Sequence, residues 1–357
     1  MSLYPFLFEH VLRRMPAEAA HRLATVGLGA AGRIRPLPRF LAPRDPVLRV
    51  EALGMRFPSP VGVAAGVDKG ATWFEGLGAL GFGFVEVGTV TAVGQRGNPR
   101  PRVWRLLADR GLLNAMGFPN PGAAKVAGRL AKRSGGGIVG VNVGKSKDTP
   151  LEDAARDYRA AARELAPLAD FVVLNVSSPN TVGLRELQAV DHLRRILDEV
   201  RAEFSGPVLV KLSPDLTDDE LDEVADLAVA HRVSGIVAVN TTTSRDGLAS
   251  DPAILANPGG VSGPPLKARA LAVLRRLHAR VGNQVTLVSV GGIDSPEDAW
   301  ERILAGATLV QGYTGFVYGG PLWPKRLNDE LARRTRAAGA RSIQDLVGTE
   351  TPVPAVA

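Results

Sequence analysis

Short apolar runs rich in β-branched residues recur through most of the chain, and segments with helical periodicity separate them. The run 171–176 (FVVLNV) and the run 207–214 (PVLVKLSP) are typical, with an amphipathic stretch between them. Near-continuous apolar strands that alternate with helices are typical of a parallel sheet buried on both faces. The complete set has eight members, at 61–66, 84–88, 138–144, 171–176, 207–214, 235–242, 285–292 and 308–314.

Eight strand–helix units predict an α/β fold, a closed (β/α)8 barrel of the TIM type. Two doubly wound halves are the alternative. The segment 94–114 is long for a loop between a strand and a helix, and its stretch RPRVWRLLADRGLLN predicts a small hairpin near the barrel mouth. Thr217, with Glu220 three residues later, predicts a capped helix start.

The first 40 residues follow a different pattern. Apolar residues between Tyr4 and Met15 recur at helical spacing, and Pro16 suits the first turn of a second helix that runs to about Gly32. A linker rich in proline and arginine follows. The chain therefore divides into an N-terminal helical segment (1–40), the barrel (41–345) and a tail that we expect to be disordered (346–357).

Both faces of the first helix carry bulky apolar side chains, which favours contact with a membrane surface over ordinary packing on the barrel. No apolar run reaches the roughly 18 residues of a transmembrane helix, and the N-terminus lacks a secretory pattern. We therefore expect a peripheral protein on the cytoplasmic side of the cell membrane. Four arginines in and after the linker suit anionic lipid headgroups: Arg33, Arg35, Arg39 and Arg44.

Composition narrows the chemistry. The 357 residues include no cysteine and only five histidines, which lack metal-binding spacing, so thiolate catalysis is excluded and no metal site is expected. The net charge is +7, but acidic residues are interspersed with the basic ones, and we predict neither a nucleic-acid partner nor an obligate protein partner. The GxGxxG stretches at 27–32 and 76–81 end helical segments instead of following a strand, which argues against a Rossmann site.

In such a barrel the catalytic groups lie at the carboxyl ends of the strands. At these positions the sequence offers the amides Asn142, Asn175 and Asn240, together with Lys69 and Lys211. An amide both donates and accepts hydrogen bonds, which suits a planar, uracil-like ring. Lys69 suits a carboxylate or a flavin, and Lys211 offers a fixed charge to an anionic reduced flavin, with a Schiff base as the alternative role.

Glycine-rich segments at 257–263, 290–293 and 312–315 follow the sixth, seventh and eighth strands, where backbone N–H groups approach a phosphate in many barrels. A phosphate-bearing cofactor such as FMN therefore fits better than pyridoxal phosphate. The stretch NVSSPNTVG (175–183) follows the fourth strand, and its serines are the only candidate bases within it. A serine hydroxyl is a poor base at its free pKa and needs activation.

These motifs, in this order, resemble the class 2 dihydroorotate dehydrogenases, the membrane-associated enzymes that use a quinone. The resemblance implies an FMN-dependent barrel that oxidises dihydroorotate to orotate in pyrimidine biosynthesis and passes the electrons to a membrane quinone. Class 1 relatives place a cysteine at the base position, so a chain without cysteine resembles class 2. The motifs span roughly residues 3–325 and include AAGVDK, GNPRPRVWRL, NAMGF, GVNVGK, LNVSSPNTVGLR, VKLSPD, NTTTSR, GGVSGPPL, VGGI and VQGYTG.

The resemblance also implies residue roles. Ser178 would take the C5 proton, while the C6 hydride would go to FMN, and His21, Arg105 and Tyr313 would line a quinone tunnel beneath the N-terminal helices. The substrate would be held by Lys69, Asn114, Ala115, Met116, Gly117, Phe118, Asn175, Asn180, Asn240 and Thr241. FMN would be held by Ala64, Ala65, Gly66, Lys69, Thr89, Asn142, Asn175, Lys211, Val239, Ser262, Gly263, Gly291, Gly292, Tyr313 and Thr314.

Some positions depart from the family pattern. Ala71 stands where glycine is usual, Pro119 stands where asparagine is commoner, and Gly312 replaces a larger apolar residue, which would widen the tunnel near the flavin. Two other functions compete with this one. A flavin barrel that reduces uracil in RNA suits the positive charge but normally relies on a cysteine. A non-enzymatic membrane-surface module leaves the strand-end amides without a role.

Overall fold

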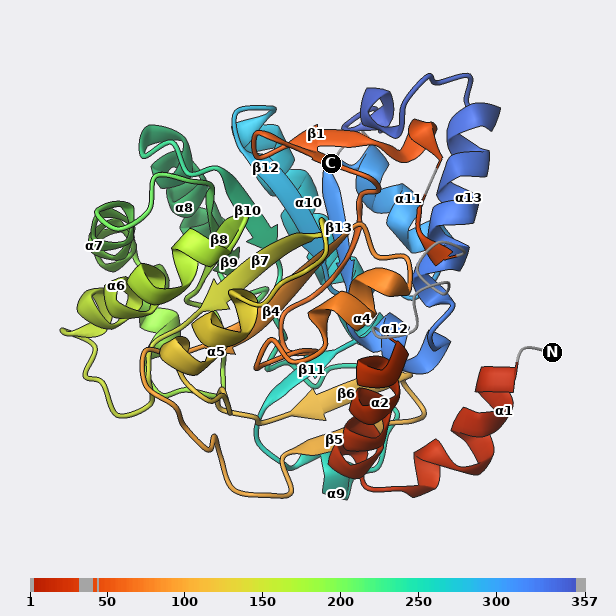
Figure 1. Cartoon of the computed structure of the whole chain (residues 1–357), viewed down its shortest axis with the longest axis horizontal. Helices are drawn as coiled ribbons and strands as arrows, with labels where there is room; N and C mark the ends of the chain where they lie inside the picture. Colours follow the sequence, from red (N-terminus) through yellow and green to blue (C-terminus); the bar gives the residue numbers. More distant parts are fainter. Residues whose placement is uncertain (1–2, 32–40, 44, 351–357) are drawn as a thin grey trace.

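The computed structural model describes residues 3–31, 41–43 and 45–350, and it places eight parallel strands in a closed barrel (Figure 1). Around the barrel the strands follow the order β10-β12-β13-β3-β4-β7-β8-β9. All eight predicted strands are confirmed, and the alternative of two doubly wound halves is wrong. Their bounds are β3 (Val61–Val63), β4 (Phe84–Val90), β7 (Ile138–Val143), β8 (Phe171–Asn175), β9 (Val208–Leu212), β10 (Gly235–Ala238), β12 (Thr286–Val290) and β13 (Leu309–Gly312).

A helix on the outside of the barrel follows each strand, as Figure 1 shows. These helices are α4 (Phe74–Ala79), α5 (Ala123–Leu130), α6 (Ala154–Leu165), α7 (Val190–Arg201), α8 (Asp218–Ala230), α10 (Lys267–Val281), α11 (Pro296–Leu304) and α13 (Trp323–Ala337). Shorter helical segments are η2 (Pro46–Leu48), η3 (Ala166–Leu168), η4 (Leu184–Gln188), α9 (Pro252–Leu255), η5 (Pro264–Leu266), α12 (Thr314–Gly319) and η6 (Ile343–Leu346). The predicted capping box of Thr217 and Glu220 starts α8.

Aromatic side chains pack within one end of the barrel. The ring of Phe84 meets Phe57 at a centroid distance of 5.3 Å and Phe171 at 6.2 Å. Gly62 and Gly140 make room for these rings, since a Cβ on either glycine would collide with Phe84 or Phe171. Phe57 belongs to an antiparallel hairpin outside the barrel, formed by β1 (Val50–Ala52) and β2 (Met55–Phe57). This packing leaves the carboxyl ends of the strands as the open end.

The predicted hairpin near the mouth is confirmed as β5 (Val103–Leu106) and β6 (Gly111–Asn114). A third strand, β11 (Gly260–Ser262), pairs with β6, and this pairing was not predicted. Buried Leu106, Leu113 and Val261 hold the sheet together. The three strands place Asn114 and Ser262 over the carboxyl end of the barrel.

Two N-terminal helices are present, as predicted: α1 (Leu3–His10), followed by the short turn η1 (Leu12–Arg14), and α2 (Ala17–Ala31). Phe8 of α1 packs on Tyr318 of α12 at a centroid distance of 5.0 Å. The stretch GLGALG, 76–81, ends α4 and precedes β4, and residues 27–31 lie within α2, so neither lies at a strand-to-helix turn. No helix in the described part of the chain is long and apolar enough to cross a membrane.

Part of the predicted linker, with Arg33, Arg35, Arg39 and Arg44, lies outside the described residues. Of the predicted tail, 351–357 also lies outside them. The first residues of that tail are held against the barrel: the Gly348 N–H donates to the Ile303 carbonyl at 3.1 Å, and Arg275 forms a two-point ion pair with Glu350.

Candidate active site

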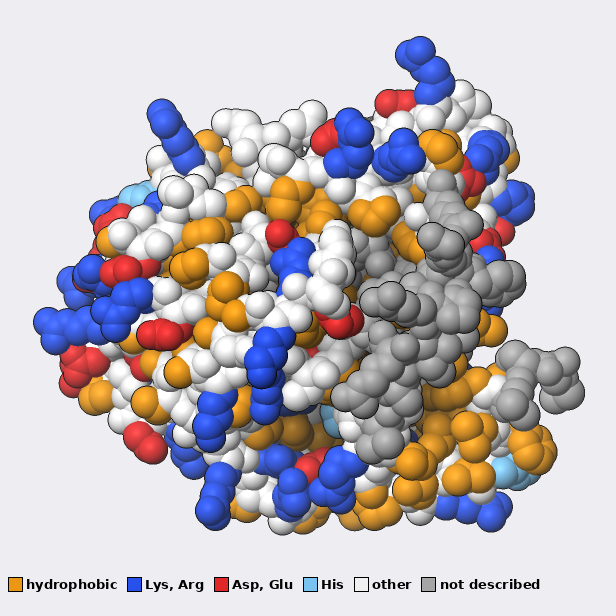
Figure 2. All heavy atoms as spheres, viewed as in Figure 1, with side chains coloured by type: hydrophobic (Ala, Val, Ile, Leu, Met, Phe, Trp, Pro, Cys, Tyr) orange, Lys and Arg blue, Asp and Glu red, His pale blue; other side chains and the backbone are white. Residues whose placement is uncertain are grey.

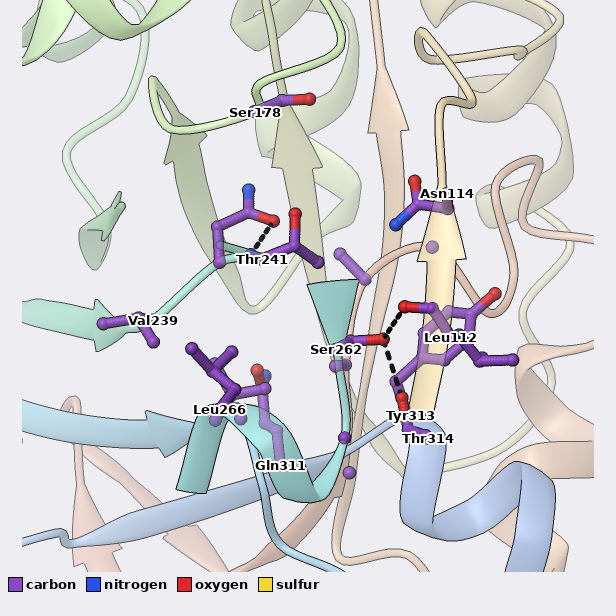
Figure 3. Close-up of a pocket in the computed structure, with 18 of the residues that line it drawn as sticks. Leu112, Asn114, Ser178, Val239, Thr241, Ser262, Leu266, Gln311, Tyr313 and Thr314 are labelled. Carbon is purple, nitrogen blue, oxygen red and sulfur yellow. Dashed lines mark hydrogen bonds between the residues drawn. The ribbon is translucent and has the colours of Figure 1, made fainter. Parts of the chain in front are cut away.

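A cavity opens at the carboxyl ends of the strands, and it contains about 1150 Å³ of empty space, including the part open to solvent. Figure 3 shows Ser178 and Asn114 toward one end of it and Ser262 and Thr314 toward the other. Of the residues predicted for substrate and FMN, those lining the cavity are Ala64, Ala65, Gly66, Lys69, Thr89, Asn114, Met116, Gly117, Phe118, Asn175, Ser178, Asn180, Lys211, Val239, Asn240, Thr241, Ser262, Gly263, Gly291, Gly292, Tyr313 and Thr314.

Two predicted site residues lie behind the cavity wall. Asn142 is fully buried, where its Nδ2 donates to Glu86 at 2.7 Å and its Oδ1 accepts from Thr89 at 2.6 Å. Ala115 is also buried, and its carbonyl accepts from Asn98 Nδ2 at 3.1 Å. Neither residue contributes to the cavity surface. Each instead takes part in hydrogen bonds that hold lining residues in place.

Asn175 lies at the end of β8, and hydrogen bonds fix the orientation of its amide. Its Nδ2 donates to Thr89 Oγ1 at 2.8 Å, and its Oδ1 accepts from Ser177 Oγ at 3.2 Å and from Asn240 Nδ2 at 3.3 Å. The Tyr158 hydroxyl donates to the Asn175 carbonyl at 2.7 Å. The direction in which Asn175 donates and accepts is therefore set by the protein.

Ser178 follows in the loop after β8 and is only 5% exposed. Its Oγ accepts the backbone N–H of Asn180 at 3.2 Å. The Asn180 side chain donates from Nδ2 to Asn114 Oδ1 at 3.1 Å, so the loop is tied to β6. The tip of the loop is by contrast exposed to solvent, since Val182 is 92% exposed. The backbone turns there at Gly183, which has a φ of 69°.

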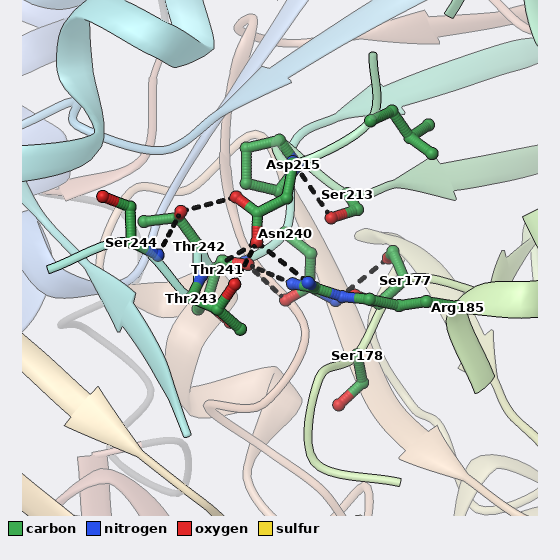
Figure 4. A network of polar contacts seen from close by, with 12 residues as sticks. Ser177, Ser178, Arg185, Ser213, Asp215, Asn240, Thr241, Thr242, Thr243 and Ser244 are labelled. Carbon is green, nitrogen blue, oxygen red and sulfur yellow. Dashed lines mark hydrogen bonds and ion pairs between the residues drawn. The ribbon is translucent and has the colours of Figure 1, made fainter. Parts of the chain in front are cut away.

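Arg185 closes the root of this loop (Figure 4). Its guanidinium donates to the Ser177 carbonyl at 3.3 Å, to the Thr241 carbonyl at 3.1 Å and to Asp215 at 2.8 Å. Asp215 in turn accepts from Thr242 Oγ1 at 2.5 Å and from the Thr243 N–H at 2.8 Å. Burial alone would raise the pKa of Asp215, but these hydrogen bonds and Arg185 lower it, so the carboxylate stays charged. The network joins the ends of β8, β9 and β10.

Two lysines bring positive charge to the cavity. Burial, followed by the nearby Arg102 guanidinium, lowers the pKa of Lys69 to about 8, while Asp68 and Glu18 act in the opposite direction. The Lys69 ammonium donates to the Gly66 carbonyl. Lys211 lies on β9 beside Asn175 of β8 in the strand register, and it is almost fully buried.

The other end of the cavity is rich in glycine and hydroxyl groups. Gly263, Gly291 and Gly292 have φ values of 99°, 107° and 76°, which favour glycine strongly. A Cβ on Gly292 would collide with the backbone of Lys267, so the turn lies close against the start of α10. The hydroxyls of Ser262 and Thr314 lie 2.9 Å apart. These are the features of an anion-binding turn.

Several lining residues were not predicted from the sequence. Gln311 interrupts the apolar run of β13, and its Nε2 donates to buried Glu86 at 2.5 Å, so a polar residue in a buried strand was the available signal. The others had no individual role in the prediction: Val103, Leu112, Pro264, Leu266 and Asp294 are mostly apolar and carry no comparable signal, whereas Val290, Ile293, Gly312 and Gly315 belong to the predicted glycine-rich segments 290–293 and 312–315.

Two departures from the family pattern can be placed. A side chain at Gly312 would collide with the ring of Trp323 on α13, so the glycine accommodates this indole, and the widening of the tunnel stays a prediction. Ala71 has a φ of 50°, in the left-handed region that glycine adopts at lower cost.

Of the three predicted tunnel residues, only Tyr313 lines the cavity. His21 of α2 packs edge-on against Trp73 at 5.5 Å, and burial, with a smaller effect of Lys69, lowers the pKa of His21 to about 4. Arg105 donates to the Met15 carbonyl at 2.7 Å. Tyr313 and Leu112 also contact the apolar cluster of Phe8 and Tyr318, which connects α1 with the cavity wall.

Comparisons with known proteins agree with this geometry. The family model described as dihydroorotate dehydrogenase matches residues 47–335. The chain is 54% identical over 364 residues to the dihydroorotate dehydrogenase (quinone) of Thermobifida fusca, covering 98% of this chain and 97% of that protein. It is 56% identical over 339 residues to the protein of the same name from Mycolicibacterium vanbaalenii, covering 94% and 96%.

A solved structure extends the likeness to three dimensions. The dihydroorotate dehydrogenase of Eimeria tenella, in complex with ferulenol, superposes with a TM-score of 0.86 at 34% identity, covering 97% of this chain and 98% of that chain. The chain belongs to the dihydroorotate dehydrogenase family.

Proposed function

We propose that this protein oxidises dihydroorotate to orotate with FMN as its resident cofactor, and that a membrane quinone takes up the electrons. The observation that carries the proposal is the composition of the one cavity described above. Preoriented amides, Lys69 and Ser178 surround one part, and a turn rich in glycine and hydroxyl groups surrounds another. The names of the relatives, which include the word quinone, support the choice of acceptor.

The residues present fit FMN. Gly263, Gly291 and Gly292 line the cavity, and a Cβ at any of them would collide with neighbouring protein atoms. Their backbone N–H groups would hold the phosphate together with the hydroxyls of Ser262 and Thr314. Lys211 supplies a buried positive charge at the strand ends. Bound FMN would supply the acceptor for the hydride from C6 of the substrate and the carrier that passes the electrons on to a quinone.

The amide groups suit the substrate ring. Dihydroorotate alternates N–H and C=O groups around its ring, and Asn114, Asn180 and Asn240 each present an amide to the cavity. Thr241 adds a hydroxyl. The ammonium of Lys69, held by the Gly66 carbonyl, would pair with the carboxylate at C6. The substrate ring would then be held by groups that the protein has already oriented before the substrate binds.

Ser178 would take the proton from C5. One lone pair of its Oγ accepts the Asn180 N–H, a hydrogen bond that would stabilise negative charge developing on the oxygen. The other lone pair remains for the substrate proton, and the original hydroxyl proton would leave through water in the cavity. The low exposure of Ser178 limits competing hydration of its oxygen.

The N-terminal helices would form the membrane-facing entrance for the quinone, on the cytoplasmic side of the cell membrane. Phe6, Leu7, Val11 and Leu23 expose large apolar side chains there, and Figure 2 shows hydrophobic side chains gathered over this region at the lower right. Such a patch on the surface of a protein is typical of a contact with a partner or a membrane. His21, Arg105 and Tyr313 would lie along the route from this patch to the cavity.

The direct test uses purified protein. We expect a flavin absorbance band near roughly 450 nm, and formation of orotate from dihydroorotate when a short-chain quinone is present. A colourless protein that binds no added FMN would contradict the cofactor. A flavoprotein that leaves dihydroorotate unchanged with every acceptor would contradict the reaction.

A further inference from the structure

A series of hydrogen bonds leads from helix α2 to the residues that line the candidate substrate site. It begins at Glu18, whose carboxylate accepts from Arg102 Nε at 3.0 Å and from Arg100 Nε at 2.9 Å. The Arg102 side chain is only 7% exposed and that of Glu18 is 21% exposed. The Glu18–Arg102 ion pair is therefore largely shielded from solvent, and removing one partner leaves a poorly hydrated charge.

Arg102 connects this ion pair with the loop 95–99. Its Nη1 donates to the Arg96 carbonyl at 2.7 Å and to the Asn98 carbonyl at 3.0 Å. The loop bends closely around the guanidinium, because Gly97 has a φ of 73° and a Cβ there would lie 2.8 Å from Arg102 Nη1. The position of Asn98 thus depends on where the Arg102 guanidinium is held.

Asn98 carries the connection to the cavity. Its Nδ2 donates to the carbonyls of Ala115 and Asn180, each at 3.1 Å. Asn180 then donates from its side chain to Asn114 at 3.1 Å and from its backbone to Ser178 Oγ at 3.2 Å. One amide therefore fixes both the strand segment after Asn114 and the loop that carries Ser178.

We propose that Glu18 is a positioning residue for the substrate, acting through Arg102 and Asn98 on Asn180 and Ser178. Helix α2 then contributes to the binding of dihydroorotate as well as to any contact with quinone or lipid. The inference rests on the proposed function. Without the Glu18 carboxylate, the Arg102 guanidinium would turn toward water, and the two carbonyls that it holds would lose their donor.

The same charges surround Lys69. Burial and Arg102 disfavour its ammonium form, whereas Asp68 and Glu18 favour it, and neutral His21 lies nearby. Loss of Glu18 would therefore also weaken the positive charge that Lys69 offers to the substrate carboxylate. Both consequences act on the affinity for dihydroorotate.

The test compares Glu18→Ala with Glu9→Ala, a matched control in which a carboxylate of α1 that pairs with Arg13 on the exposed surface is removed. Turnover is measured with a water-soluble dye as acceptor, so that quinone access does not enter. We expect Glu18→Ala to raise KM for dihydroorotate about tenfold, as loss of a charged hydrogen bond does, with unchanged flavin content. Glu18→Asp should recover part of the loss, and Glu9→Ala should match the wild type.

Hydrogen exchange gives a readout that needs no turnover. A peptide that covers 178–183 should exchange faster in Glu18→Ala than in the wild type or in Glu9→Ala. Unchanged KM together with unchanged exchange would overturn the inference, and so would effects of the same size in Glu9→Ala. A wild type that oxidises no dihydroorotate would contradict the proposed function, whereas the exchange experiment would still test the connection.

Discussion

At the scale of single residues, Ser178 is the side chain on which the proposed chemistry depends most. Its Oγ is buried beside the cavity and accepts only one backbone N–H among the described contacts, so it retains capacity to accept a proton. We expect Ser178→Ala to keep its flavin and to lose about 10²-fold or more in dihydroorotate oxidation near pH 7. Ser177→Ala is the comparison variant. It removes a hydroxyl that bonds to the amides Asn175 and Asn240 but does not line the cavity, so it should lower the rate much less than Ser178→Ala does. Equal rates for Ser178→Ala and the wild type would remove the base assignment.

Lys69 gives the proposed reaction a pH dependence. Burial and Arg102 lower the pKa of Lys69 to about 8, so the free protein loses this positive charge as the pH rises through that value. The carboxylate of dihydroorotate binds the charged form, and KM for dihydroorotate should therefore increase above about pH 8. A Lys69→Gln variant should have a high KM that no longer changes over this range. Profiles of KM against pH that are the same for both proteins would contradict the role of Lys69.

At the scale of elements, the barrel strands could be predicted because burial on both faces makes them nearly continuous apolar runs. Strand β11 could not, since the three residues Gly260–Ser262 lie in a glycine-rich stretch and pair with β6, which lies far away in the sequence. The roles of Asn98 and Arg102 could not be predicted for the same reason, because their hydrogen-bond partners are brought close by the tertiary fold and not by any local sequence pattern. The strand-end amides were recognisable because the carboxyl ends of the strands meet at one mouth of a barrel, so several amides at these ends point to one site. Asn142 follows that pattern too, yet its side chain is buried behind the wall.

The loop after β8 shows how an element can be held at one end only. Arg185 fixes its root through Ser177, Thr241 and Asp215, while its tip at Val182 is exposed. We expect Arg185→Gln to lower kcat for dihydroorotate about tenfold and to destabilise the fold by about 1–3 kcal/mol, because three acceptors lose a charged donor. Steady-state kinetics and thermal unfolding measure the two effects.

A variant of Asp215, the ion-pair partner of Arg185, shows how much of the effect on kcat depends on the charge of that partner. In Asp215→Asn the side chain keeps an acceptor oxygen for Arg185 but loses its charge, so we expect a smaller change in kcat than in Arg185→Gln. Flavin content should stay constant in both variants, since neither residue lies at the glycine-rich end of the cavity. A loss of stability without any change in kcat would show that the contacts of Arg185 stabilise the fold but do not position the loop for catalysis.

At the scale of the whole molecule, apolar surface is concentrated on the N-terminal helices, at the side where the cluster of Phe8 and Tyr318 leads toward the cavity. Phe6 is 63% exposed and Leu23 is 55% exposed. If this surface enters a lipid bilayer, replacing both side chains with serine removes apolar area worth about 1.5–3 kcal/mol each. We expect the double variant Phe6→Ser/Leu23→Ser to bind vesicles of anionic phospholipid at least about tenfold more weakly.

The turnover of the same double variant tests whether the N-terminal helices deliver quinone to the cavity. Turnover with a long-chain quinone embedded in the vesicles should fall together with vesicle binding, because the quinone reaches the protein only from the bilayer. Turnover with a water-soluble dye should stay at the wild-type rate, since neither residue lines the cavity. Val93→Ser, at an exposed apolar residue outside the N-terminal helices, is the matched control and should change neither rate. If the double variant keeps full activity toward the embedded quinone, the N-terminal helices are not the entrance, and the quinone must reach the flavin by another face.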